Sequence, residues 1–194
     1  AQVIAGNERV VRPRLSDAAF FWSSDRQQRL DSRAEGLRRV TFQTQLGSVH
    51  DKSERVRKLA QSVASSIGGD PRLADRAAEL AKCDLTSAMV GEFPELQGLM
   101  GRYYAQHDGE HAEVCEAIRE QYLPRFAGDE LPATRSGMAV SIADKLDTIA
   151  GIYATGQKPT GTRDPFGLRR AALGLLRTTI ERRLEIDLQQ LIDQ

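Results

Sequence analysis

The chain of 194 residues lacks several features that mark specialised classes of protein. Its two cysteines, Cys83 and Cys115, have no CxxC spacing, which excludes a disulfide framework and fits a reducing compartment. No apolar run approaches the roughly 18 residues of a membrane span, so no membrane partner is expected. Charge of one sign is not in excess, because 27 basic residues balance 27 acidic ones. Any contact with a polyanion must therefore use a local patch.

Motifs that build common catalytic centres are missing as well. The sequence has no GxSxG turn around a nucleophilic serine. A phosphate-binding loop needs spaced glycines followed by Lys-Ser or Lys-Thr. Neither Gly68-Gly69 nor the Gly161–Arg163 segment has this pattern. We therefore assign no catalytic residue.

Histidines are too few and too scattered to predict a metal centre. Two of the three stand in the dipeptides His50-Asp51 and His107-Asp108. His107 and His111 are four residues apart, which on one helix would place both imidazoles on one face. Gly109 weakens the helix at that point, so we expect loop positions for this pair. Asp51 is expected to stabilise the start of a helix through the helix dipole.

Helical periodicity is what the chain does have, and it predicts an all-α bundle of about seven to nine helices. Apolar residues recur every three or four positions in 50–67, the mark of a helix with one buried face. The pairs Asp70-Pro71 and Asp164-Pro165 each predict a helix start, with the aspartate as cap and proline at the first helical position. No strand pattern occurs. Expected core positions of 50–67 are Val56, Leu59, Ala60, Val63 and Ile67.

Two units are expected along the chain. Residues 1–15 contain alternating apolar residues and then Pro13, so we expect an extended lead-in or linker from a preceding domain. Ser16 is expected to cap the first helix of an all-helical domain that covers 16–194. Gly98 and Gly101 fall inside an expected helix over 95–105, where close packing would explain them.

The stretch from Ser141 to Arg177 holds the most specific patterns. In its first helix, over 137–153, Asp144 falls opposite the apolar stripe, so periodicity predicts a solvated carboxylate. In its last helix, Arg170 and Arg177 lie on one edge with Gly174 between them, an edge that can receive a phosphate backbone. The expected apolar stripe of the first helix is Ile142, Leu146, Ile149, Ala150 and Tyr153, and that of the last is Phe166, Leu173, Leu176 and Ile180.

Five long runs of the sequence resemble one known family, the β subunit of bacterial heterotetrameric glycyl-tRNA synthetase. They are GNERVVRPRLSDAAFF (Gly6–Phe21), VGEFPELQGLMGRYYA (Val90–Ala105), YLPRFAGDELP (Tyr122–Pro132), ADKLDTIAG (Ala143–Gly151) and PTGTRDPFGLRRAALGLLR (Pro159–Arg177). The resemblance covers nearly the whole chain. It implies the middle, HD-like helical domain of that subunit.

The resemblance also implies a function. The family forms an ATP-dependent glycine–tRNA ligase in the cytoplasm, with an α2β2 assembly in which the α subunit uses ATP and Mg²⁺. This chain would bind no cofactor and have no activity alone, but would support assembly and the binding of tRNA(Gly). The residues expected to contact tRNA phosphates are Arg169, Arg170, Arg177, Lys158 and Arg163.

A degenerate metal site follows from the same resemblance. HD domains hold a divalent metal through a histidine, a His-Asp pair and a later aspartate. These positions match Lys52, Cys83-Asp84 and Asp144 here, so both histidines are absent. An ammonium group and a thiol are a mismatched set for a hard metal ion, and no metal is expected. An active metal-dependent phosphohydrolase and a purely structural interaction module stay open as alternatives.

Overall fold

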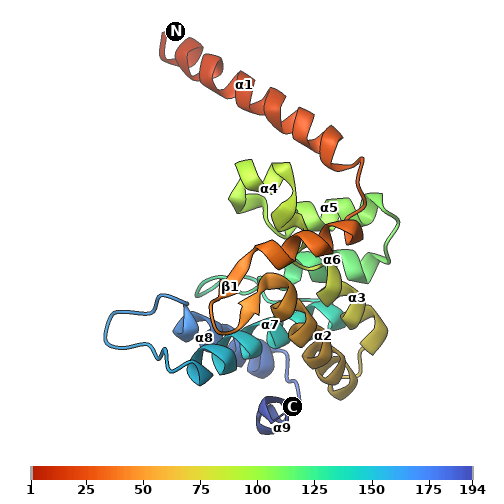
Figure 1. Cartoon of the computed structure of the whole chain (residues 1–194), viewed down its shortest axis with the longest axis vertical. Coiled ribbons are helices and arrows are strands. Elements are labelled where there is room, and N and C mark those ends of the chain that lie inside the picture. The colour runs from red at the N-terminus through yellow and green to blue at the C-terminus, as the bar shows by residue number, and fades with distance from the viewer. Residues whose placement is uncertain (1, 194) are drawn as a thin grey trace.

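The chain folds into a bundle of α-helices with one small hairpin, as a computed structural model that describes residues 2–193 shows (Figure 1). The predicted all-α class is confirmed. The α-helices are α1 (Gln2–Asp25), α2 (Val49–Ser66), α3 (Pro71–Leu80), α4 (Ala88–Glu92), α5 (Leu99–His107), α6 (Ala112–Glu120), α7 (Arg135–Ala154), α8 (Leu168–Glu181) and α9 (Leu188–Ile192). Shorter elements are the 3₁₀ turns η1 (Asp31–Arg39), η2 (Cys83–Thr86) and η3 (Pro94–Leu96) and the strands β1 (Thr41–Gln43) and β2 (Gly47–Ser48).

Helix α7 is the centre of the bundle. It packs against α2, α3, α6 and α8, and every residue from Ser136 to Ala143 is buried. A helix surrounded in this way has no solvated face, so its sequence is apolar on most sides. The predicted single stripe is therefore wrong in part: Ile142 and Leu146 are buried, but Tyr153 is 44% exposed.

Helices α2 and α3 start as the sequence predicts. The Ser48 side chain accepts a hydrogen bond from the Asp51 amide, and Asp51 accepts one from the Ser48 amide, which together form a capping box. Asp70 caps α3, with Pro71 as its first residue. Of the core predicted in 50–67, four residues are buried and Leu59 is partly buried against them.

The hairpin was not predicted. Strands β1 and β2 pair antiparallel, with Thr41 opposite Ser48 and Gly47 at a φ of 85° in the turn. The pairing is too short to leave an alternating pattern in the sequence, which explains why no strand was expected.

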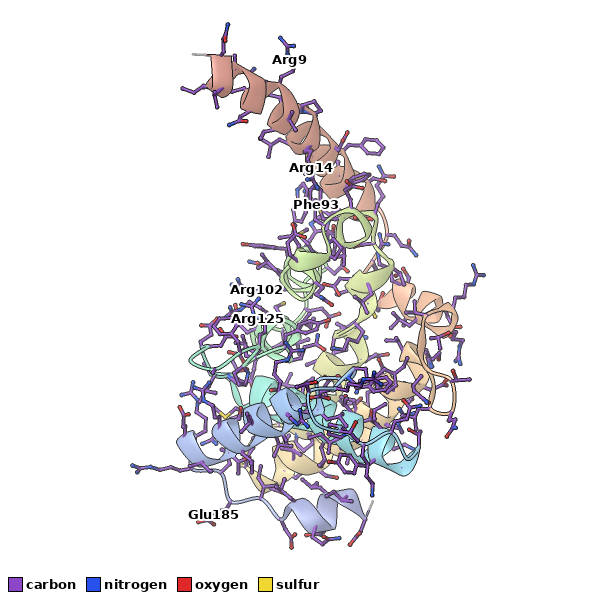
Figure 2. The ribbon with its side chains drawn as sticks, turned by 90° about the vertical axis from the view of Figure 1, so that its left-hand side faces the viewer. Arg9, Arg14, Phe93, Arg102, Arg125 and Glu185 are labelled. Atoms are coloured by element: carbon purple, nitrogen blue, oxygen red, sulfur yellow. The ribbon has the colours of Figure 1, made fainter. Side chains whose placement is uncertain are left out.

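The N-terminal segment corrects a prediction. Residues 2–15 are helical instead of extended, and α1 runs on through Ser16, whose hydroxyl bonds the Arg12 carbonyl. The apolar residues of this segment, read as alternating, also suit helical spacing, and α1 continues through Pro13. Helix α1 projects from the body (Figure 1). Midway along it, Arg14 lies 5.1 Å from the ring centre of Phe93 (Figure 2). The predicted boundary at residue 15 lies inside α1 and stays a prediction.

Helix α8 begins later than predicted. It starts at Leu168, after Gly167 in the left-handed conformation at a φ of 64°. Asp164 still satisfies its first turn, because its carboxylate accepts hydrogen bonds from the amides of Leu168 and Arg169. Asp164 therefore caps the helix as predicted, but three residues separate it from the first helical residue, whereas the prediction placed it directly before the helix.

Candidate functional site

Lys52 lies where α2 crosses α7, in the middle of the predicted degenerate site. Its ammonium group donates hydrogen bonds to Asp147 Oδ2 at 2.9 Å and Thr148 Oγ1 at 2.8 Å. It also lies 3.4 Å from Asp144 Oδ1 and 4.8 Å from the centre of the Phe42 ring. Two carboxylates and an aromatic face therefore stabilise a lysine that is 5% exposed.

Asp144 is held between lysines. Its side chain is 18% exposed, and Lys82 Nζ lies 3.5 Å from Oδ1, on the same oxygen that Lys52 approaches. Burial disfavours the charged carboxylate, but the ammonium groups of Lys52, Lys82 and Lys145 outweigh it and hold the pKa of Asp144 well below its usual range. The solvated Asp144 that periodicity predicted is wrong, since α7 has no free face at this turn.

Asp84 does not join this cluster, and it caps α5 instead. Its Oδ2 atom accepts hydrogen bonds from the amides of Gly98 at 2.6 Å and Gly101 at 3.0 Å. Gly98 has a φ of 79°, so the helix predicted over 95–105 is broken there and restarts at Leu99. A Cβ on Gly101 would lie 2.7 Å from Ile118 Cγ2, so close packing does explain this glycine. Burial raises the pKa of Asp84 to about 6.

Cys83 points away from the cluster as well. Its thiol donates to the Glu79 carbonyl at 3.4 Å, and burial raises the pKa of the thiol to about 12. A thiol that stays protonated is a poor metal ligand.

The donor set does not fit a divalent metal ion. Of the four matched positions only Lys52 and Asp144 meet, and an ammonium group 3.4 Å from the carboxylate repels a cation there. Within residues 2–193, no group of three or more His, Cys, Asp or Glu side chains is arranged to hold a metal. His107 ends α5 and His111 caps α6, so these two residues do not share a helix.

Sequence reasoning missed three charged residues around this site. Asp147 bonds both Lys52 and Arg55, whose Nε lies 2.5 Å from Asp147 Oδ1. Lys145 donates to the Leu123 carbonyl at 2.7 Å and is 7% exposed, and burial lowers its pKa to about 8. Lys82 is the third. For Lys145 and Asp147 the sequence did contain a signal, because residues 144–147 carry three charges within an otherwise mostly apolar helix.

The basic residues predicted to contact RNA fall on and around the start of α8. Lys158 and Arg163 lie in the loop that extends from the body between α7 and α8 (Figure 1), and Arg169 and Arg170 lie in the first turn of α8. All four are exposed, and none forms an ion pair with any other residue of 2–193. We define these four residues as the basic segment.

Arg177 differs from the basic segment. It forms an ion pair with Glu181 at 2.8 Å, one helical turn later. Gly174 is buried, and a Cβ there would lie 3.0 Å from Lys145 Cε, so this glycine allows α8 to pack on α7. The predicted open edge between Arg170 and Arg177 is therefore wrong. The prediction of which face of α8 is buried is also wrong. Leu173, Leu176 and Ile180, expected in the core, are 63%, 45% and 70% exposed.

The fold and the site define an all-α domain with a buried ion-pair cluster between α2 and α7 and with exposed basic residues around the start of α8. The chain belongs to the glycyl-tRNA synthetase beta subunit family, whose model matches residues 1–194. Among curated relatives named glycine–tRNA ligase beta subunit, it is 61% identical to that of Hahella chejuensis over 98% of the chain. It is 59% identical to that of Marinobacter nauticus over 97%.

The chain spans 27–28% of the length of these relatives. Properties of the whole relatives are therefore proposals for this chain. Across the described part of the chain, no helix is long and apolar enough to cross a membrane.

Proposed function

We propose that the chain is a noncatalytic helical domain of a glycine–tRNA ligase β subunit, and that it supports assembly and the binding of tRNA(Gly). In this proposal the α subunit of an α2β2 enzyme uses ATP and Mg²⁺ to form the glycyl adenylate. The enzyme works in the cytoplasm. The observation that carries the RNA-binding role is the basic segment, Lys158, Arg163, Arg169 and Arg170, whose side chains are exposed and form no ion pair within residues 2–193.

Exposed cations without an ion-pair partner can bind RNA phosphates, whereas cations that stabilise the fold are usually paired with carboxylates. Arginine and lysine bind phosphates through charge-assisted hydrogen bonds and release counterions from RNA. Such contacts position a nucleic acid without reading its sequence. The carboxylate of Asp164 accepts hydrogen bonds from the amides at the start of α8, and its charge also interacts with Arg169 and Arg170 without forming an ion pair.

The test uses the assembled ligase with all four residues of the basic segment changed to glutamine. We expect the rate of ATP–pyrophosphate exchange with glycine to stay unchanged, because adenylate formation needs no tRNA. The kcat/KM for tRNA in aminoacylation should fall by about tenfold or more. Arg57→Gln is the matched control, since Arg57 is already paired with Asp75 and Glu54. Unchanged aminoacylation by the fourfold variant would favour a purely structural module instead.

The alternative of a metal-dependent phosphohydrolase has no support from the donor set. Asp144 is neutralised by two lysines, and Asp84 is engaged with α5. We therefore do not propose it.

A further inference from the structure

A cavity of about 440 Å³ opens beside the basic segment. Its lining includes Phe166, Gly167 and Arg170, at and just before the start of α8, together with Tyr122 and Arg125. Ligand pockets for small organic molecules have volumes of roughly 300–1,000 Å³, so one nucleotide fits this space. Because Arg170 belongs both to the cavity and to the basic segment, a strand that lies on the segment passes the mouth of the cavity.

Two aromatic rings line this cavity. Phe166 is half-buried, and within residues 2–193 its ring stacks on no other ring and carries no cation. The Tyr122 ring is engaged by Lys82, whose Nζ lies 4.1 Å from the ring centre. The face of Phe166 is therefore available for stacking, the interaction that proteins use for unpaired bases.

Polar groups at the rim suit the rest of a nucleotide. Gln97 is exposed, and its side-chain amide has no hydrogen-bond partner within the described residues, so it offers both a donor and an acceptor to a base edge. Arg170 has no ion-pair partner within the described residues, whereas Nε of Arg125 lies 3.4 Å from Asp129 Oδ2. The one carboxylate in the wall, Asp144, is already neutralised by lysines. A phosphate beside Arg170 is therefore compatible with the local charge.

From these groups we infer that the cavity binds one unstacked nucleotide of an RNA strand, with its base against Phe166 and its phosphate at Arg170. The inference rests on the proposed RNA-binding function and adds a base-binding pocket to it. A free mononucleotide also has a base and a phosphate. The experiment therefore distinguishes a nucleotide of an RNA strand from a free mononucleotide.

The experiment measures the affinity of the full chain for a short single-stranded RNA and for the same RNA with its bases removed. For Phe166→Ala we expect affinity for the intact RNA to fall by about fivefold or more, because one stacked base contributes at least that much. Affinity for the abasic RNA and the salt dependence of binding should not change. Phe166→Tyr, which keeps the ring, should retain wild-type affinity. Phe126→Ala is the matched control, since Phe126 is 60% exposed and lies outside the cavity.

The outcomes separate this inference from the proposed function. Loss of affinity in Arg169→Gln/Arg170→Gln, with no loss in Phe166→Ala, would overturn the pocket and leave the RNA-binding surface. No loss in either variant would overturn both. Competition for the cavity by adenosine, guanosine, cytidine or uridine monophosphate, with no difference between intact and abasic RNA, would assign it to a free nucleotide and contradict an RNA residue.

Discussion

Lys52 shows how one buried residue joins two helices of this fold. Its ammonium group holds Asp147 and Asp144 of α7 against α2, and the three side chains together are mostly removed from solvent. A buried ion pair contributes little net stability compared with apolar packing, but the loss of one partner leaves an uncompensated charge. The cluster is therefore expected to be sensitive to single substitutions.

Lys52→Met tests this sensitivity. We expect the free energy of unfolding to fall by about 1–3 kcal/mol, because the two carboxylates lose their shared donor but Asp144 keeps Lys82 and Asp147 keeps Arg55. Chemical denaturation measures the change. Lys58→Met, on an exposed position of the same helix, should stay within about 0.5 kcal/mol of the wild type. Equal effects of the two substitutions would contradict the role given to Lys52.

Asp84 predicts a specific dependence of stability on pH. Its pKa is raised to about 6 in the folded chain, while the unfolded value is near 3.9. Between these values the folded state binds more protons than the unfolded state, so this group lowers stability as pH rises from about 4 to about 6. Above that range its effect is constant.

Asp84→Asn isolates this contribution. Relative to the wild type, the variant should gain on the order of 3 kcal/mol in the free energy of unfolding between pH 4 and pH 6, measured by urea denaturation at each pH. Asp70→Asn should leave the pH dependence between pH 4 and pH 6 nearly unchanged and should act with the opposite sign below about pH 4, because hydrogen bonds from Arg72 lower the pKa of Asp70. A difference between wild type and Asp84→Asn that is independent of pH would rule out the raised pKa.

At the scale of elements, α8 connects the core to the exposed basic surface. Its buried side carries Leu168, Gly174, Leu175 and Thr178, and this side packs on α7. Its outer side mixes exposed aliphatic residues with arginines. The contribution of an apolar side chain to the free energy of unfolding grows with the area that it buries. Neighbouring leucines on this helix should therefore differ sharply in their effect on stability.

Leu175→Ala and Leu173→Ala form a matched pair on α8. Leu175 is 4% exposed, and its truncation should lower the free energy of unfolding by about 2–5 kcal/mol. Leu173 is 63% exposed, and its truncation should change stability by less than about 0.5 kcal/mol. Thermal unfolding of both variants checks the phase of the helix. The reverse order of effects would support the phase predicted from the sequence pattern.

Local patterns in the sequence predicted α2 and α3 well, because capping residues and one-sided apolar spacing act within a few residues. They also predicted that α7 and α8 exist, but they assigned the wrong residues to the buried faces of these two helices. A central helix such as α7 buries most of its surface, so Asp144 looks solvated by periodicity although Lys52 and Lys82 cover it. The role of Asp84 depends on Gly98, which is far along the chain, and no local spacing reveals that contact.

At the scale of the whole molecule, charge is balanced overall but not evenly distributed. Most arginines are paired with nearby carboxylates, as Arg57 is with Asp75 and Arg76 with Glu110. The basic segment at the start of α8 has no such partners within residues 2–193. The physical basis for proposing an RNA contact there is that four such cations lie close together in the sequence, around the start of α8.

The salt dependence of tRNA(Gly) binding by the assembled ligase tests this account most directly. Each phosphate contact contributes about 0.7–0.9 to the slope of log Kd against log salt concentration. Loss of Lys158, Arg163, Arg169 and Arg170 together should therefore lower the slope by about 3, with weaker binding at low salt. An unchanged slope and an unchanged affinity in the fourfold glutamine variant would contradict the account.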